Sequence, residues 1–199
     1  MKKLRLLILA LILPLQVFLS RAQGESSAPA LKMVETYLNE ARTFTADFEQ
    51  IDNAGKLSHG KFYLSRPGKL RLQYTDPTPL TIVADGQFLI HHDSSTRETT
   101  TMALSETPAE FILRENIRFD EGIKVTQFQE EKNTYKVTLA RSAVAETGTL
   151  TLKFSKKPLK LVQWIVIDSQ GLDTTVNLTN LKTNVPIDQK SFIFQESIS

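Results

Sequence analysis

The first 22 residues differ in pattern from everything that follows them. Three basic residues among the first five precede an apolar run over residues 6–19, which ends in Ser20-Arg21-Ala22. This order is typical of a secretory signal peptide, and the run is shorter than the roughly 20 apolar residues that a membrane-spanning helix needs. We therefore predict a signal peptide over residues 1–22 and a single domain over residues 23–199.

One helical segment and then a long series of strands follow the signal peptide. Apolar residues recur at helical spacing from Leu31 to Ala41, which predicts an amphipathic helix over about residues 30–42. From Phe44 onward apolar and polar residues alternate, and clusters of Gly, Pro, Asn and Asp separate the short runs, as in antiparallel hairpins. The later strands are expected at 125–128, 135–139, 150–154, 162–167, 174–178 and 191–194.

The alternation assigns side chains of two early strands to opposite faces of a sheet. One face is apolar and the other polar, a pattern typical of an antiparallel sheet with one solvated face. The residues expected on the apolar face are Phe62, Leu64, Arg66, Leu70, Leu72 and Tyr74. Those expected on the polar face are Lys61, Ser65, Lys69, Arg71 and Gln73.

A second helix is predicted at Thr107-Pro108-Ala109-Glu110, with Thr107 as N-cap and Glu110 completing a capping box. Two short helices cannot cover a curved sheet of ten or so strands. Much of the apolar sheet face must therefore close on itself or on a ligand.

Composition narrows the class of protein. There is no cysteine, which excludes disulfides, thiolate metal sites and a lipid-modified cysteine after the signal peptide. Removal of the signal leaves 20 basic and 22 acidic side chains, a net charge of −2, which argues against a nucleic-acid partner. A hydrophobic content of 41% argues against disorder. Because no cysteine follows the signal peptide to carry a lipid, we expect a soluble, unanchored domain.

Candidate catalytic chemistry is absent from the sequence patterns. There is no glycine-rich phosphate loop, nucleophile elbow, metalloprotease helix or zinc-spaced cluster. His91 and His92 are adjacent on an expected strand and point to opposite faces, so they cannot chelate one metal together. We predict no enzyme activity, no metal and no cofactor, although a hydrolase triad assembled in space would need no motif.

Short segments in a fixed order carry a family resemblance over nearly the whole mature chain. The longest, residues 60–74, is Gly-Lys-Phe-Tyr-Leu-Ser-Arg-Pro-Gly-Lys-Leu-Arg-Leu-Gln-Tyr. The others are Pro79, 82–86, Thr107-Pro108, 148–152, Gln163-Trp164, 168–171, 175–180 and Phe192. In this combination they resemble the periplasmic outer-membrane lipoprotein carrier proteins, LolA.

The resemblance implies a mainly β protein with a few helices: a single unclosed antiparallel β-barrel with a helical lid over an apolar cavity. It also implies that the cavity shelters lipoprotein acyl chains in the periplasm. An inner-membrane ABC-type transporter would release the lipoproteins, and an outer-membrane receptor would accept them. We expect a monomer.

The resemblance also implies site residues. The family's lid is held by an arginine at a strand end, which matches Arg66 in Ser-Arg-Pro-Gly. On an apolar face this side chain needs acceptors, and helix-end carbonyls would serve; a solvated arginine at a turn is the alternative. The matching lid partners are Leu38, Ile112, Leu113 and Trp164. The expected cavity lining is Phe62, Leu64, Leu70, Leu72, Tyr74, Phe88, Ile90 and Phe111, some of which would also pack as core.

The sequence departs from the family pattern at two places, and it fits two alternative functions. Leu72 stands where many relatives carry Trp, and the tail after Phe194 is short. A soluble carrier of another apolar ligand, such as a glycolipid, fits the same pattern. An outer-membrane receptor or structural lipoprotein of similar fold fits less well, because the cysteine is missing.

Overall fold

The computed structural model describes residues 27–75, 78, 80–120, 122–141 and 148–195. The predicted signal peptide at 1–22 and its cleavage site lie outside the described residues. So do parts of two expected turns, at residues 76–79 and at Thr147.

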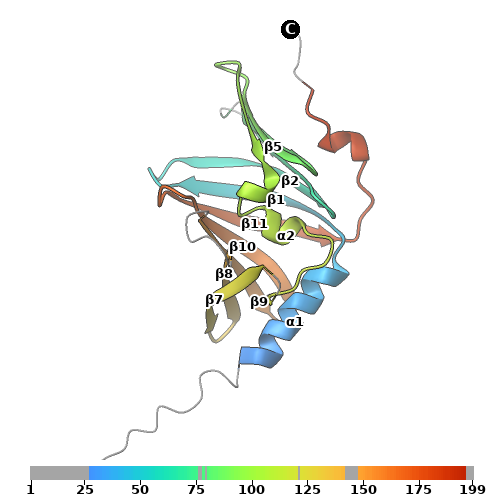
Figure 1. The fold of residues 1–199 in the computed structure, drawn as a ribbon, viewed down its shortest axis with the longest axis vertical. Coiled ribbons are helices and arrows are strands. Elements are labelled where there is room, and N and C mark those ends of the chain that lie inside the picture. Colours follow the sequence, from blue (N-terminus) through green and yellow to red (C-terminus); the bar gives the residue numbers. More distant parts are fainter. Residues whose placement is uncertain (1–26, 76–77, 79, 121, 142–147, 196–199) are drawn as a thin grey trace, which may run out of the picture.

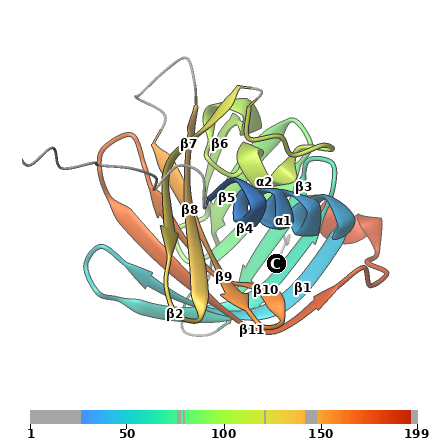
Figure 2. The same ribbon diagram turned by 90° about the horizontal axis from the view of Figure 1, so that it is seen from below.

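The described residues form one curved antiparallel sheet of eleven strands, in the order β6-β5-β4-β3-β2-β1-β11-β10-β9-β8-β7. The edge strands β6 and β7 do not pair with each other, so the barrel is not closed (Figure 2). The predicted mainly β, unclosed antiparallel architecture is confirmed. The strands are β1 Thr43–Asp52, β2 Leu57–Ser65, β3 Lys69–Tyr74, β4 Leu80–Asp85, β5 Phe88–Asp93, β6 Glu98–Ala103, β7 Ile123–Glu130, β8 Thr134–Arg141, β9 Thr149–Lys156, β10 Leu159–Ile167 and β11 Asp173–Thr183.

Helix α1, Ser27–Glu40, lies across the open, concave side of the sheet (Figures 1 and 2). Its buried residues are Ala30, Val34 and Leu38. Val34 and Leu38 belong to the predicted apolar stripe, whereas Leu31 is only partly buried and Ala41 follows the end of the helix. The helix ends before Arg42 because the Arg42 N–H donates to the Asn184 side-chain oxygen at 2.8 Å. The Asn184 amide in turn donates to the Glu40 carbonyl at 3.1 Å, which closes this end of the helix.

The second helix differs from its prediction. A 3₁₀ turn, η1 Leu104–Glu106, is followed by a short α2, Glu110–Leu113. The Thr107 hydroxyl donates to the Leu104 carbonyl at 2.9 Å and so closes η1 rather than capping α2. The Glu110 carboxylate pairs with Arg114 at 2.7 Å and with Arg141 at 3.1 Å. The predicted capping box is therefore wrong, because both of its side chains have other partners.

The chain beyond β11 also departs from the prediction of a strand at 191–194. It forms a 3₁₀ turn, η3 Gln189–Phe192, which begins where the Asp188 carboxylate accepts the Lys190 N–H at 3.0 Å. The turn packs on the outer face of the sheet, where Phe192 is 1% exposed. Ser65, expected in solvent, is buried there, with its hydroxyl 3.5 Å from the Gln189 amide.

The core lies on the concave face, where alternate strand residues meet α1 and α2. The largest fully buried side chains include Phe44, Phe62 and Phe154. The Trp164 ring meets Phe62 edge-on, with 5.0 Å between ring centroids. Phe48 lies opposite Gly60 in the β1–β2 register, and its ring covers the space where a side chain would be.

We expect Gly60→Ala to lower the free energy of unfolding by at least about 1–3 kcal/mol, the usual range for overpacking. A Cβ at this position would lie 2.6 Å from Phe48 and would also collide with the Gln73 carbonyl oxygen. Urea unfolding is the measurement, and His59→Ala at the exposed neighbouring position is the control. Equal unfolding midpoints for the two variants would contradict this packing.

Candidate functional site

A small apolar cavity lies between the two helices and the concave face of the sheet. Its volume is about 10 Å³, room for one water molecule at most. The residues around it come from α1, α2, β1, β2 and β10. They are Leu38, Ile112, Phe44, Phe62, Leu64, Leu161 and, just after the end of β2, Arg66.

The structure brings many of the predicted site residues together. Leu38 and Ile112 of the expected lid line the cavity with Phe62, Leu64 and Arg66. The remaining ones on the inner face are buried in the core around the cavity without lining it. These are Leu70, Leu72, Tyr74, Phe111, Leu113 and Trp164.

The expectation that Phe88 and Ile90 line the cavity is wrong. Ile90 pairs with Val83, which pairs with Arg71 on the outer face, so the register places Ile90 outside the barrel. Phe88, two residues earlier, faces the same way and is 44% exposed. The inner-face residue is Leu89, which packs against the core.

A turn fixes the register of β5. The Asp85 carboxylate accepts the N–H groups of Gln87 and Phe88 at 2.8 and 2.9 Å, which starts β5 at Phe88 and sets Leu89 opposite Ala84. Ile90 lines an outer pocket of about 470 Å³ with residues of the C-terminal segment, among them Phe192.

Arg66 is a buried cation at the edge of the apolar cavity, 8% exposed. Its Nη2 donates to the Ala41 carbonyl, at the end of α1, at 2.5 Å. The guanidinium lies 5.7 Å from the Phe44 ring centroid, within cation–π range. The alternative of a solvated arginine is therefore wrong, and the expected helix-end acceptor is present.

The charge of Arg66 is compensated only in part. Within the described residues, Nε and Nη1 have no hydrogen-bond partner. Burial, and secondarily the nearby Arg42, lower the pKa of Arg66 to about 10, so the side chain stays protonated at neutral pH. The carbonyl at the end of α2 is not its acceptor: the Leu113 oxygen accepts the Gly68 N–H at 2.8 Å.

Further polar contacts hold α1 over the cavity. The Tyr37 hydroxyl accepts the Leu161 N–H of β10 at 3.3 Å. The Asn39 amide donates to the Ile117 carbonyl at 2.9 Å and accepts the Ile117 N–H at 2.8 Å. Arg42 donates to the Glu115 carbonyl at 2.7 Å. The lid is therefore fastened both to the sheet and to the segment that follows α2.

Several of these residues carry little or no signal in the local sequence pattern. Phe44 and Leu161 line the cavity, and the alternation that begins at Phe44 could have identified the first of them. Leu161 lies next to a break in the β9–β10 register, which no local pattern reveals. Asn39 gives no signal either, because its partner is a backbone group 78 residues away.

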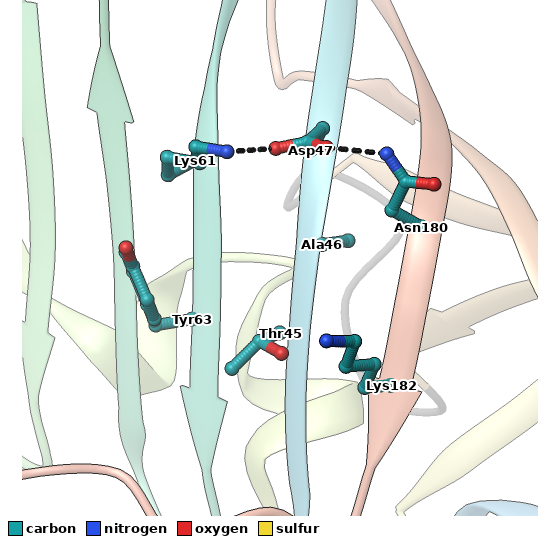
Figure 3. Close-up of a pocket in the computed structure, with 7 residues that line it drawn as sticks. All are labelled: Thr45, Ala46, Asp47, Lys61, Tyr63, Asn180 and Lys182. Carbon is teal, nitrogen blue, oxygen red and sulfur yellow. Dashed lines mark hydrogen bonds and ion pairs between the residues drawn. The ribbon is translucent and has the colours of Figure 1, made fainter.

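Figure 3 shows a second hollow, on the outer face of β1, β2 and β11. Asp47 lies at its centre between Lys61 and Asn180. Hydrogen bonds from Asn180 and Lys61 lower the pKa of this carboxyl. The cluster is polar and its acid is already paired, so it is a solvated surface rather than a site for an apolar ligand.

Across the described ranges, His, Asp and Glu side chains form no group of three or more that could hold a metal ion. The described helices are all too short or too polar to cross a membrane.

We expect Asn39→Ala to lower the free energy of unfolding by about 1–3 kcal/mol, because it leaves both backbone groups of buried Ile117 unpaired. Backbone amides near Ile117 should then exchange hydrogen faster than in the wild type. Met33→Ala, on the exposed side of the same helix, is the control. Unchanged exchange would show that Asn39 does not fasten the lid.

We expect Tyr74→Phe to reduce the loss of stability at alkaline pH. Burial raises the pKa of Tyr74 to about 12, against 10.0 ordinarily. The contribution of Tyr74 to the free energy of unfolding is therefore complete below about pH 10. About 2 kcal/mol of that free energy is lost as the pH rises through about 12, because the unfolded chain ionises more readily. Chemical unfolding between pH 9 and 12 measures the slope, with Tyr63→Phe on the outer face as control. Identical slopes for wild type and Tyr74→Phe would disprove the assignment.

Comparison with known proteins identifies the family. The family model for "Outer membrane lipoprotein carrier protein LolA" matches residues 39–195. An outer-membrane lipoprotein carrier protein of Legionella pneumophila (strain Corby) is 30% identical over 197 residues, covering 95% of this chain and 93% of that protein. The one of Methylococcus capsulatus is 28% identical over 193 residues, covering 92% and 91%.

Among solved structures, a DUF1329 family protein from Desulfovibrio piger matches with a TM-score of 0.51 at 10% identity, covering 84% of this chain and 96% of that one. This likeness concerns the fold alone. The residues matched by the family model include all eleven strands, α2 and Arg66, and begin at the last two residues of α1. The chain belongs to the outer-membrane lipoprotein carrier family, LolA.

Proposed function

We propose that this protein is a non-enzymatic periplasmic carrier, exported by its signal peptide, that shelters the acyl chains of lipoproteins between the inner and the outer membrane. An ATP-driven transporter in the inner membrane would load it, and an outer-membrane receptor would take the cargo. Family membership supports the cargo class. The observation that carries the mechanism is Arg66, hydrogen-bonded to the end of α1 beside an apolar cavity.

A closed cavity of about 10 Å³ cannot hold an acyl chain. Cargo binding therefore requires α1 and α2 to move away from the concave face, and the ligand then replaces their apolar contacts. The lid residues that would move are Leu38, Ile112 and Leu113, and the wall that they leave behind includes Trp164. The polar contacts of α1 would have to break or shift at the same time.

The cost of opening keeps the affinity in a useful range. Burial of about fifteen methylenes at about 0.8 kcal/mol each is worth roughly 12 kcal/mol per chain. Several chains would exceed the practical ceiling of noncovalent affinity, near roughly −20 kcal/mol. A carrier that must also release its cargo needs an unfavourable free energy that offsets part of this binding. Breaking the Arg66–Ala41 hydrogen bond on opening would supply part of that cost.

The test loads purified mature protein from inner-membrane vesicles that contain labelled lipoprotein, a competent transporter and ATP. We expect the label to become soluble in a one-to-one complex with the wild type. Absence of release would contradict the carrier function and shift the ligand to another apolar class, such as a glycolipid.

We expect Arg66→Leu to fold and to take up cargo but to deliver it at least about tenfold more slowly. Loss of one charge-assisted hydrogen bond, about 1.5–3 kcal/mol, weakens the force that closes the lid and expels the cargo. Transfer to receptor-bearing liposomes is the measurement, and Arg71→Leu on the outer face of β3 is the matched control. Unchanged delivery by Arg66→Leu would remove this residue from the mechanism.

A further inference from the structure

The buried end of Arg66 has hydrogen-bonding capacity that the closed lid does not use. Nη2 donates to the Ala41 carbonyl, whereas Nε and Nη1 are buried without a partner among the described residues. The other side chains around the cavity are all apolar. Burying donors without acceptors is unfavourable, and more so for a charged group. In the closed state, two donor nitrogens of Arg66, Nε and Nη1, could therefore bind an acceptor that the described residues do not supply.

The electrostatics favour an acceptor with negative charge. No described carboxylate lies within ion-pair distance of Arg66, and Arg42 adds a second positive charge nearby. The walls of the cavity are apolar, so the field of the guanidinium is weakly screened there. A partly or fully negative oxygen that enters with an apolar chain would be stabilised at this point.

We propose that the unpaired nitrogens of Arg66 bind the carbonyl or carboxylate oxygen at the head of an acyl chain, whose tail occupies the opened apolar cavity. This inference rests on the proposed function, because it requires the cavity to open to such a chain. It adds a polar subsite and an orientation: the cavity recognises the head of the chain as well as its length.

The orientation follows from β2. Leu64 and Phe62 follow Arg66 on the inner face at every second position, so the wall extends roughly 13 Å from Arg66 to Phe62. Trp164 meets Phe62 at the far end of this wall. The head of the chain would lie at Arg66, and the tail would run along β2 past Leu64 toward Phe62.

Two kinds of ligand share this chemistry. A free fatty acid offers a carboxylate, whereas the acyl chain of a larger lipid offers a neutral ester or amide carbonyl. Three probes of equal chain length separate them: laurate, methyl laurate and 1-dodecanol. Each is titrated calorimetrically into the mature wild type, Arg66→Leu and the outer-face control Arg71→Leu.

We expect the wild type and Arg71→Leu to bind laurate at least about tenfold more tightly than dodecanol. Arg66→Leu should abolish this preference, whereas dodecanol should bind to this variant at least as tightly as to the wild type, because the bond that closes the lid is absent. The carboxyl ¹³C resonance of bound laurate should also show ionisation at lower pH in the wild type than in Arg66→Leu, because the guanidinium stabilises the anion.

The outcomes are distinct. If methyl laurate shows the Arg66 dependence too, a neutral acyl carbonyl suffices; if only laurate shows it, the site selects the anion; both support the subsite. Equal wild-type affinity for laurate and dodecanol, or an equal loss of all three ligands in Arg66→Leu, overturns it. If dodecanol binds to none of the proteins, the proposed opening of the cavity fails and the subsite with it.

Discussion

An antiparallel sheet that curls without closing leaves an apolar concave face, and the rest of this structure depends on how that face is covered. The edge strands β6 and β7 do not pair, so the sheet cannot complete its own core. Helix α1 and the short α2 cover the opening, and the cavity that Leu38, Ile112 and the facing strands line among the described residues measures about 10 Å³. The same surface that stabilises the closed protein is thus the surface that an acyl chain would occupy.

Two kinds of contact hold the lid, and a ligand affects them differently. Apolar contacts of Leu38 and Ile112 with the sheet can be replaced by methylene groups at similar free energy per area. Directional bonds from Arg66 to Ala41 and from Leu161 to Tyr37 cannot be replaced by a hydrocarbon chain. The net cost of opening is therefore set mainly by a few polar contacts. Arg66 differs from the other polar contacts, because a ligand with a polar head could replace the hydrogen bond that Arg66 loses on opening.

The sequence predicted what local periodicity determines. Helix α1, most strands and the inner position of Arg66 follow from alternation and turn residues that act over a few positions. Phe88 and Ile90 were misplaced because three consecutive apolar residues fit either face, and the hydrogen bonds of Asp85 decide between them. Residues 191–194 resemble a strand, but Asp188 starts a 3₁₀ turn there instead. The role of Asn39 cannot be predicted from local pattern, because its hydrogen-bond partner is a backbone group 78 residues away.

The two halves of the sheet are supported unequally, which bears on where the proposed opening would occur. Strands β2 to β4 carry the core on their inner face and the η3 segment on their outer face, where Lys69 and Arg71 bond to Gln189 and Ser191. Arg66 comes directly after β2, one of the strands that are covered on both faces. The backbone that carries Arg66 is therefore held by the sheet. Helix α1, in contrast, is hydrogen-bonded to β10 through Tyr37 and Leu161, and to the segment after α2 through Asn39. Opening should therefore move the helices and the segment that links β6 to β7, while the wall that carries Arg66 stays in place.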